Sequence, residues 1–266
     1  MARCLADMGN VRSSLEYYRK SAAIREAITG GSPAFQAHVQ TMLAGVYGYM
    51  SGAMHLQGDL DAALSLQSKA RDILARQVEA DPQNATLQQY LLQSEYWVGY
   101  YLAEKGLPAQ ALPHYQVALA GYEKLTSADT HDVLARRYLG QCYVGIGRAL
   151  AADGQAATGI ESARKAVRIF ESLAADDHFK PSYLADAHSA VAYAYSRLAS
   201  QPGISKTLKI ASWRDARSWY RKSLDIWLLL KSKAQLTKWN ATEPDRIANE
   251  IARCDAALVK LNASNP

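Results

Sequence analysis

Glycines recur along this chain at an almost constant interval. Gly9, Gly58, Gly106 and Gly154 are separated by 49, 48 and 48 residues. Other residue classes keep the same 48-residue step, and these are Leu43, Leu91 and Leu139, together with Asp81, Asp129 and Asp177. Because several independent classes of position share one register, the recurrence is an internal repeat. Repeats of this kind are typical of one supersecondary unit that stacks on copies of itself.

The sequence between successive glycines predicts pairs of helices. Gly58–Pro82 is the clearest second helix of a pair, because a Gly-Asp turn precedes an apolar stripe with helical spacing and Asp81-Pro82 ends it. Pro113 predicts a kink or a late start in its helix. The expected helices cover residues 10–29, 34–57, 59–80, 85–105, 108–127, 131–152, 155–175, 182–200, 211–236 and 245–262.

The repeat register divides the chain into units. The fifth unit departs from it, because Ala216–Ser223 matches Ser14–Ser21 only after about nine extra residues, which predicts an insertion at 201–210. The expected fold is all-α: one domain, 1–266, built as a right-handed α-solenoid of antiparallel helix pairs with a C-terminal capping helix. Its expected parts are a partial repeat at 1–33, repeats at 34–83, 84–130, 131–180 and 181–240, and the cap at 243–262.

The second helices share a further pattern of small, then aromatic, then small residues, in which Gln67 and Ala163 occupy the aromatic position in two repeats. The members are Ser14, Tyr18 and Ser21; Ala63, Gln67 and Ala70; Ala111, Tyr115 and Ala118; and Gly159, Ala163 and Ala166. Together with Gly99 and Gly147 on the first helices and the closing Asp81-Pro82, this pattern resembles the tetratricopeptide repeat (TPR). Small residues at these positions let helices approach closely.

The 48-residue period exceeds the usual TPR length of about 34 residues. Lengthened repeats of this kind are similar to those of kinesin light chains. They are still more similar to the C-terminal TPR arrays of some bacterial serine/threonine kinases. The resemblance implies a scaffold or adaptor that binds a protein or peptide without catalysis and without a cofactor.

In TPR proteins the first helices line a concave face, so the resemblance also implies a binding groove. The positions expected to be exposed there are Gln89, Gln93, Tyr96 and Tyr100 in one unit and Arg137, Gln141 and Arg148 in the next. Amide, aromatic and guanidinium groups suit an extended peptide backbone or an acidic terminus. A second interpretation stays open, in which the groove is only solvated and the tyrosines pack partly between helices.

Basic charge is concentrated between residues 204 and 240. This segment has a net charge of +7, against +5 for the whole chain, and holds four of the five tryptophans. Arg214, Arg217 and Arg221 share one helical face. Nucleic-acid binding by this basic face is one alternative. We favour the interpretation in which the tryptophans are core residues, the charges are solvated, and any partner is an acidic protein.

The residues that usually carry catalysis or bind metals are not arranged for either role. No two of the six histidines stand at i and i+4, and the three cysteines are far apart. Asp186, His188 and Ser189 resemble a catalytic triad only in composition, because such close neighbours on a helix point in different directions. The sequence therefore predicts a protein that is not an enzyme and has no metal site.

The chain has no glycine-rich nucleotide loop, His-Arg-Asp or Asp-Phe-Gly motif. It also opens inside a repeat, which suggests a C-terminal fragment of a longer protein. The alternative function is therefore the regulatory or sensory region of a bacterial kinase with its catalytic domain elsewhere. The uncovered edge of the first unit predicts self-association. The cysteine usage and short apolar runs favour a cytoplasmic location without a membrane segment.

Overall fold

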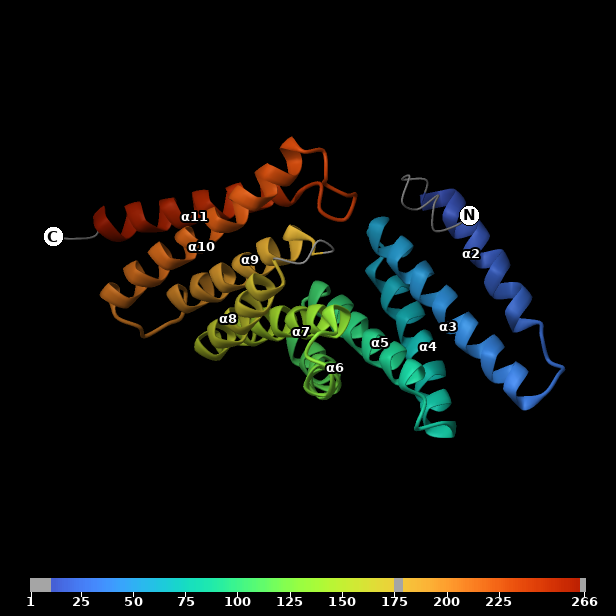
Figure 1. Ribbon diagram of the computed structural model, residues 1–266. Helices are drawn as coiled ribbons and strands as arrows, with labels where there is room; N and C mark the ends of the chain where they lie inside the picture. Colours follow the sequence, from blue (N-terminus) through green and yellow to red (C-terminus); the bar gives the residue numbers. More distant parts are fainter. Residues whose placement is uncertain (1–10, 175–178, 264–266) are drawn as a thin grey trace. The chain divides into compact units, whose positions relative to one another are not determined.

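The structure is a computed structural model that describes residues 11–174 and 179–263. These residues form ten helices and, within those limits, no strand (Figure 1). The predicted all-α helical-repeat fold is therefore confirmed. The chain divides into two compact units, Met1–Leu107 and Pro108–Pro266. The repeat boundaries as domain divisions stay a prediction.

Unit 1 contains four described helices. They are α2 (Val11–Glu26), α3 (Pro33–Leu56), α4 (Leu60–Ala80) and α5 (Ala85–Glu104). Each helix packs against the next one along the chain. Short polar side chains begin three of them: Ser32, Asp59 and Asn84 each accept a hydrogen bond from a backbone N–H in the first turn of α3, α4 and α5.

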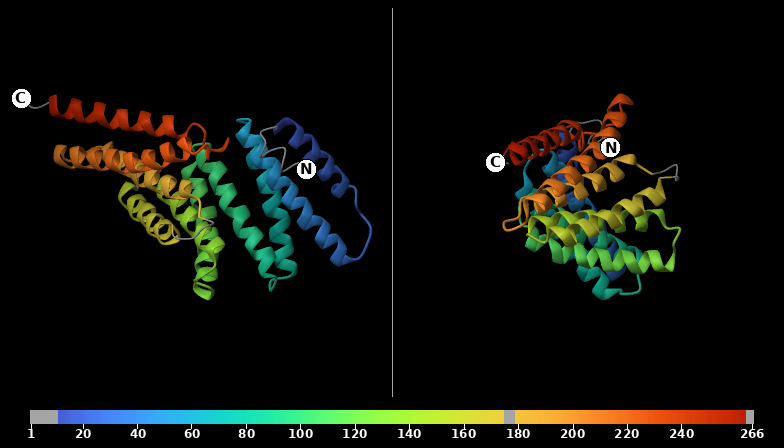
Figure 2. Two further views of the ribbon diagram at one scale, coloured as in Figure 1. Left: turned by 45° about the horizontal axis from the view of Figure 1, so that its top comes forward. Right: turned by 90° about the vertical axis from the view of Figure 1, so that its left-hand side faces the viewer.

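The described residues of unit 2 form six helices. They are α6 (Pro108–Ala128), α7 (Val133–Ala152), α8 (Ala156–Leu173), α9 (Pro181–Ala199), α10 (Lys206–Ser232) and α11 (Glu243–Ala263). Successive helices again pack together, and the first helices α7 and α9 also touch each other (Figure 2). The terminal helix α11 packs on α10 and buries Ile247, Cys254 and Leu258.

The turn glycines occupy the conformation that their spacing predicts. Gly58, Gly106 and Gly154 have φ values of 82°, 76° and 87°, and Gly203 has 78°. This left-handed region is strained for residues with a Cβ atom, so glycine is the natural choice at each helix connection. Gly9, the first member of the series, lies outside the described residues.

The small repeat positions lie where helices cross. Ala63, Ala111 and Ala216 at the first small position, and Ala163 at the central position of its repeat, have no exposed surface. In α4 the central position of the pattern is Gln67, which forms a buried polar network. Its side-chain amide accepts a hydrogen bond from Ser51 Oγ at 2.8 Å and donates one to Ser94 Oγ at 2.8 Å. These bonds satisfy the buried amide, so a polar residue is tolerated in this core position.

The repeat register extends to side-chain contacts. Tyr47 and Tyr143 lie two periods apart, and in each case the hydroxyl donates to a glutamate of the preceding helix while a lysine of the following helix lies over the ring. The two sets are Glu26, Tyr47 and Lys69 in unit 1 and Glu123, Tyr143 and Lys165 in unit 2. The two units therefore repeat this polar contact between helices as well as the apolar pattern.

Two helices differ in detail from the sequence expectation. Of the two outcomes expected at Pro113, the late start does not occur, because α6 begins at Pro108 and continues through Pro113; a kink at this residue stays a prediction. A proline at this position removes a single backbone N–H donor, and the buried side chains of Ala111 and Tyr115 hold the helix in place. The helix expected at 211–236 instead covers Lys206–Ser232, so half of the predicted insertion is helical.

Both ends of α10 have a local cause. Ser205 Oγ accepts a hydrogen bond from Leu208 N at 3.2 Å, which begins the helix five residues earlier than expected. At the other end Ala234 has a φ of 52°, and Gln235 N donates to Leu230 O at 2.9 Å. This is the bonding of a Schellman helix end, whose left-handed position is usually glycine. Because this position is alanine and not glycine, the sequence contains no signal for the end of α10.

Ala234→Gly should therefore stabilise unit 2. Glycine adopts the left-handed conformation without the steric cost that an L-residue incurs, so we expect the free energy of unfolding to rise by about 1 kcal/mol. Urea denaturation followed by circular dichroism measures the change. Ala211→Gly is the matched control, because it lies inside α10 and should lower the same quantity by about 1 kcal/mol. A loss of stability in Ala234→Gly would contradict the assignment of the helix end.

Candidate functional site

The predicted groove residues are distributed over the two units. Gln89, Gln93, Tyr96 and Tyr100 lie on α5 of unit 1, and Arg137, Gln141 and Arg148 lie on α7 of unit 2. The structure brings each set together on one helix. The role of these residues in binding stays a prediction.

The tyrosines of α5 belong to an aromatic cluster. Tyr96 is only 8% exposed, against the expectation of an open position, because its ring packs edge-on against Trp97 with centroids 5.3 Å apart. Tyr100 is half-buried and packs against Trp97 at 5.3 Å and His55 at 5.5 Å. Replacing Tyr96 would therefore disturb packing as well as any binding surface.

The large exposed side chains of unit 1 on the first helices are different ones. Phe35 at the beginning of α3 is 47% exposed, and further along the helices Met42 and Tyr49 on α3 and Tyr90 on α5 are 41%, 49% and 44% exposed. Tyr90 follows Met42 by one period, so the two residues occupy equivalent positions on successive first helices. The second helix α4 has no large exposed hydrophobic residue. The sequence analysis missed these residues, although the 48-residue register could have located Tyr90 from Met42.

Arg148 connects two first helices of unit 2. Its Nη2 donates to Ser189 Oγ at 2.6 Å and lies 4.0 Å from Asp186 Oδ1 on α9. The guanidinium therefore already has partners within the unit. A ligand at this position would compete with those contacts.

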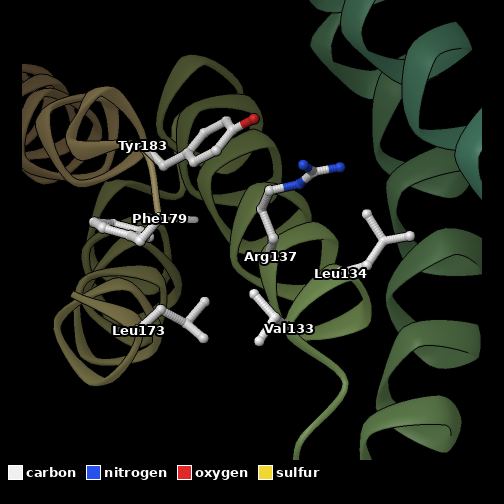
Figure 3. A pocket seen from close by; sticks show the side chains of 6 residues that line it. All are labelled: Val133, Leu134, Arg137, Leu173, Phe179 and Tyr183. Carbon is white, nitrogen blue, oxygen red and sulfur yellow. The ribbon is translucent and has the colours of Figure 1, made fainter. Parts of the chain in front are cut away.

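Arg137 borders a pocket of about 230 Å³ at one end of unit 2. The pocket lies between the beginnings of α7 and α9 and the end of α8 (Figure 3). Its lining residues are Val133, Leu134, Arg137, Leu173, Phe179 and Tyr183. In Figure 3 the Tyr183 hydroxyl and the guanidinium lie on the same side, and Val133 faces Leu173 across the apolar part. Gln141, one turn further along α7, is half-buried.

The three arginines of the predicted basic face on α10 differ in their surroundings. Arg214 and Arg221 are exposed, whereas Arg217 is half-buried and donates to Asp255 Oδ1 of α11 at 2.8 Å. The charge of Arg217 is therefore balanced within the fold. Trp227 is buried in the core, but Trp239 is 46% exposed, so the interpretation of the tryptophans as core residues is wrong for Trp239. Lys222 lies 4.2 Å above the ring of Trp219. Binding by this face, to nucleic acid or to an acidic protein, stays a prediction.

Asp186 and Ser189 lie together beside Arg148, whereas His188 packs elsewhere. Ser189 Oγ donates to the Asp186 carbonyl at 2.9 Å and accepts from Arg148, whereas the His188 ring lies 5.3 Å from that of Trp219. Burial and, to a smaller extent, the charge of Lys222 together lower the pKa of His188 to about 4. This arrangement does not provide a serine nucleophile activated by a neighbouring imidazole.

The described cysteines are not reactive, and the described residues form no metal-binding site. Burial raises the pKa of the Cys142 thiol, and it raises the pKa of Cys254 to about 11, so both are protonated at neutral pH. Across residues 11–174 and 179–263 no group of three or more His, Cys, Asp or Glu side chains is placed to hold a metal ion. Cys4 lies outside the described residues.

In the part of the chain that the structure describes, no helix combines the length and apolar character needed to cross a membrane.

Comparisons with protein-family models and with curated proteins give no match. Among solved structures, BtubC (BKLC) from P. vanneervenii superposes with a TM-score of 0.60 at 12% identity, over 86% of this chain and 78% of that chain. A singly substituted form of the nearly identical TPR-like repeats of a kinesin light chain-like protein from Podosopora anserina gives 0.52 at 15% identity, over 88% and 93%. A second structure of these repeats gives 0.50 at 16%, over 84% and 92%.

Identities of this size establish a likeness of fold and nothing about partners. They agree with the repeat pattern of the sequence and with the paired helices of both units. The chain therefore has a TPR-like helical-repeat fold.

Proposed function

We propose that this protein is a non-catalytic scaffold or adaptor that binds a protein segment through the first helices of unit 1. The observation that carries the proposal is the uneven distribution of exposed apolar side chains. Met42, Tyr49 and Tyr90 are exposed on α3 and α5, whereas the second helix α4 between them has no large exposed hydrophobic residue. The outer second helix α2 exposes Tyr17 and Ile24. Aromatic residues and methionine are enriched in protein interfaces, where charged residues are depleted.

The neighbouring side chains support binding of an extended segment. Gln89 and Gln93 are half-buried on α5, and their amide groups can each donate to and accept from a peptide backbone. Tyr49 stacks on Tyr18 of α2 with ring centroids 5.6 Å apart and an interplanar angle of 10°. A ring held in this way loses little conformational entropy when it binds, so more of the contact energy contributes to affinity.

The test is selection of peptides from a random display library on the full chain, followed by calorimetric titration of the selected peptides. Met42→Ser, Tyr49→Ser and Tyr90→Ser together should weaken binding by about thirtyfold, because buried aromatic contacts dominate interface energies. The control replaces the exposed charged residues Asp72, Arg76 and Glu79 of α4 by serine. Exposed charges contribute little, so this variant should bind as the wild type does, within about threefold.

The proposal fails if the α3 and α5 variant keeps its affinity while the α4 variant loses it. It also fails if the selection returns no binding peptide. Circular dichroism of both variants shows whether the helices are intact, so that loss of fold is not read as loss of binding.

A further inference from the structure

We propose that the pocket at the beginnings of α7 and α9 binds a compact apolar carboxylic acid, whose carboxylate is held by Arg137. This inference does not rest on the scaffold function, because the pocket belongs to unit 2 and the proposed protein-binding surface belongs to unit 1. It rests on the Arg137 guanidinium, which has no carboxylate partner among the described residues, and on the volume and apolar lining of the pocket beside it (Figure 3).

Arg137 differs from the other partly buried arginines of unit 2. Arg148 donates to Ser189 and Arg217 pairs with Asp255, whereas no carboxylate of the described residues lies within ion-pair distance of the Arg137 guanidinium. The guanidinium shares a hydrogen bond with the Tyr183 side chain, and its Nε is buried without a partner. Its charge is therefore not balanced by a carboxylate of the described residues, and a ligand carboxylate gains affinity by accepting hydrogen bonds from its remaining donors.

Two aromatic rings orient the guanidinium. Its central carbon lies 4.7 Å from the ring centroid of Tyr138 and 5.6 Å from that of Tyr183. The planar donors are therefore fixed before any ligand arrives. A guanidinium in a fixed plane favours a carboxylate, which can accept two parallel hydrogen bonds from it.

The other lining residues determine the size and polarity of the part of the ligand that carries the carboxylate. Val133, Leu134, Leu173 and Phe179 supply apolar walls. The volume of about 230 Å³ exceeds the roughly 150 Å³ of an engineered apolar cavity that binds benzene. One six-membered ring or one branched aliphatic group with its carboxylate fits this volume. Such an acid has two possible sources: a free small molecule, or the C-terminal apolar residue of a peptide.

The experiment titrates the full chain with benzoate, with the peptide Gly-Gly-Leu, and with benzamide as a neutral isostere of benzoate, and follows binding by calorimetry. Benzoate and Gly-Gly-Leu should bind, and benzamide should bind at least about tenfold more weakly, since it lacks the charge that the guanidinium recognises. If benzoate and Gly-Gly-Leu bind with similar affinities, a free acid is sufficient as the ligand and no peptide chain is needed. Much tighter binding of the peptide identifies a chain terminus.

Arg137→Gln should weaken benzoate binding by at least about tenfold. Arg136→Gln is the matched control: it removes the same charge from the adjacent residue of α7, whose guanidinium instead donates to Ser172 Oγ at 2.8 Å. This control should stay within about twofold of the wild type. If Arg137→Gln lowers the melting temperature, Val133→Phe replaces it, because the larger side chain fills the apolar part of the pocket.

The proposal is overturned if neither acid binds, if benzamide binds as well as benzoate, or if Arg136→Gln and Arg137→Gln weaken binding equally. Asp176 and Asp177, which lie outside the described residues, follow Leu173 in the sequence. Benzoate affinity should be the same when both are replaced by asparagine. If the double replacement greatly increases the affinity for benzoate, then Arg137 normally pairs with one of these aspartates, and the proposal is overturned.

Discussion

Gly159→Ala should lower the free energy of unfolding by about 2 kcal/mol, because α7 and α8 cross at this point without room for a methyl group. An ideal Cβ at Gly159 would lie 2.6 Å from the carbonyl oxygen of Gly147 and 3.1 Å from the backbone nitrogen of Ala151. Both contacts are with backbone atoms, so the helices themselves must move apart. The cost exceeds the gain of about 1 kcal/mol that alanine brings inside a helix.

The matched control is the same substitution in a helix of unit 1. A Cβ at Gly45, in the middle of α3, meets no atom within 4 Å. Gly45→Ala should therefore raise the free energy of unfolding by about 1 kcal/mol through helix propensity alone. Urea denaturation followed by circular dichroism measures both variants. Equal signs for the two substitutions would contradict the close crossing of α7 and α8.

The same glycine illustrates what the sequence could predict. Gly159 stands at the small position that Ala63 and Ala111 occupy in the two preceding repeats, and the 48-residue register placed all three at helix crossings. Periodicity predicts such positions because each repeat must bury the same face against its neighbours. The ends of α10 could not be located in this way. They depend on a serine cap at Ser205 and on a left-handed Ala234, and neither follows from the register.

The candidate site was less accessible to prediction. The register correctly identified α5 and α7 as first helices, but it could not show which of their side chains stay open to solvent. Tyr96 is only 8% exposed, and Arg148 of α7 is occupied by Ser189 of α9, because exposure depends on how the helices pack. Arg137 was singled out by its charge, whereas the pocket beside it depends on Leu173 and Phe179 from other parts of the chain. No spacing within α7 could have revealed that combination.

Acidification should destabilise unit 2 through His188. The ring is buried on α9, and its native pKa is lowered from 6.5 to about 4, first by burial and then by the charge of Lys222. Between pH 6.5 and pH 4 the His188 imidazole binds a proton in the unfolded chain but stays neutral in the native state. The stability that the neutral imidazole provides is therefore complete above pH 6.5 and is lost as the pH falls towards 4. With 1.36 kcal/mol for each pKa unit, the loss from pH 7 to pH 5 is about 2 kcal/mol.

His188→Gln removes this titration and keeps a neutral polar side chain beside Trp219. The free energy of unfolding of the wild type, minus that of His188→Gln, should fall by about 2 kcal/mol between pH 7 and pH 5. His131→Gln is the control, because the His131 side chain is 97% exposed and folding does not remove it from water. Urea titrations at several pH values give all three curves, and subtraction cancels the carboxylates that the proteins share. A wild-type curve that runs parallel to the His188→Gln curve would show that the imidazole is not held neutral by the fold.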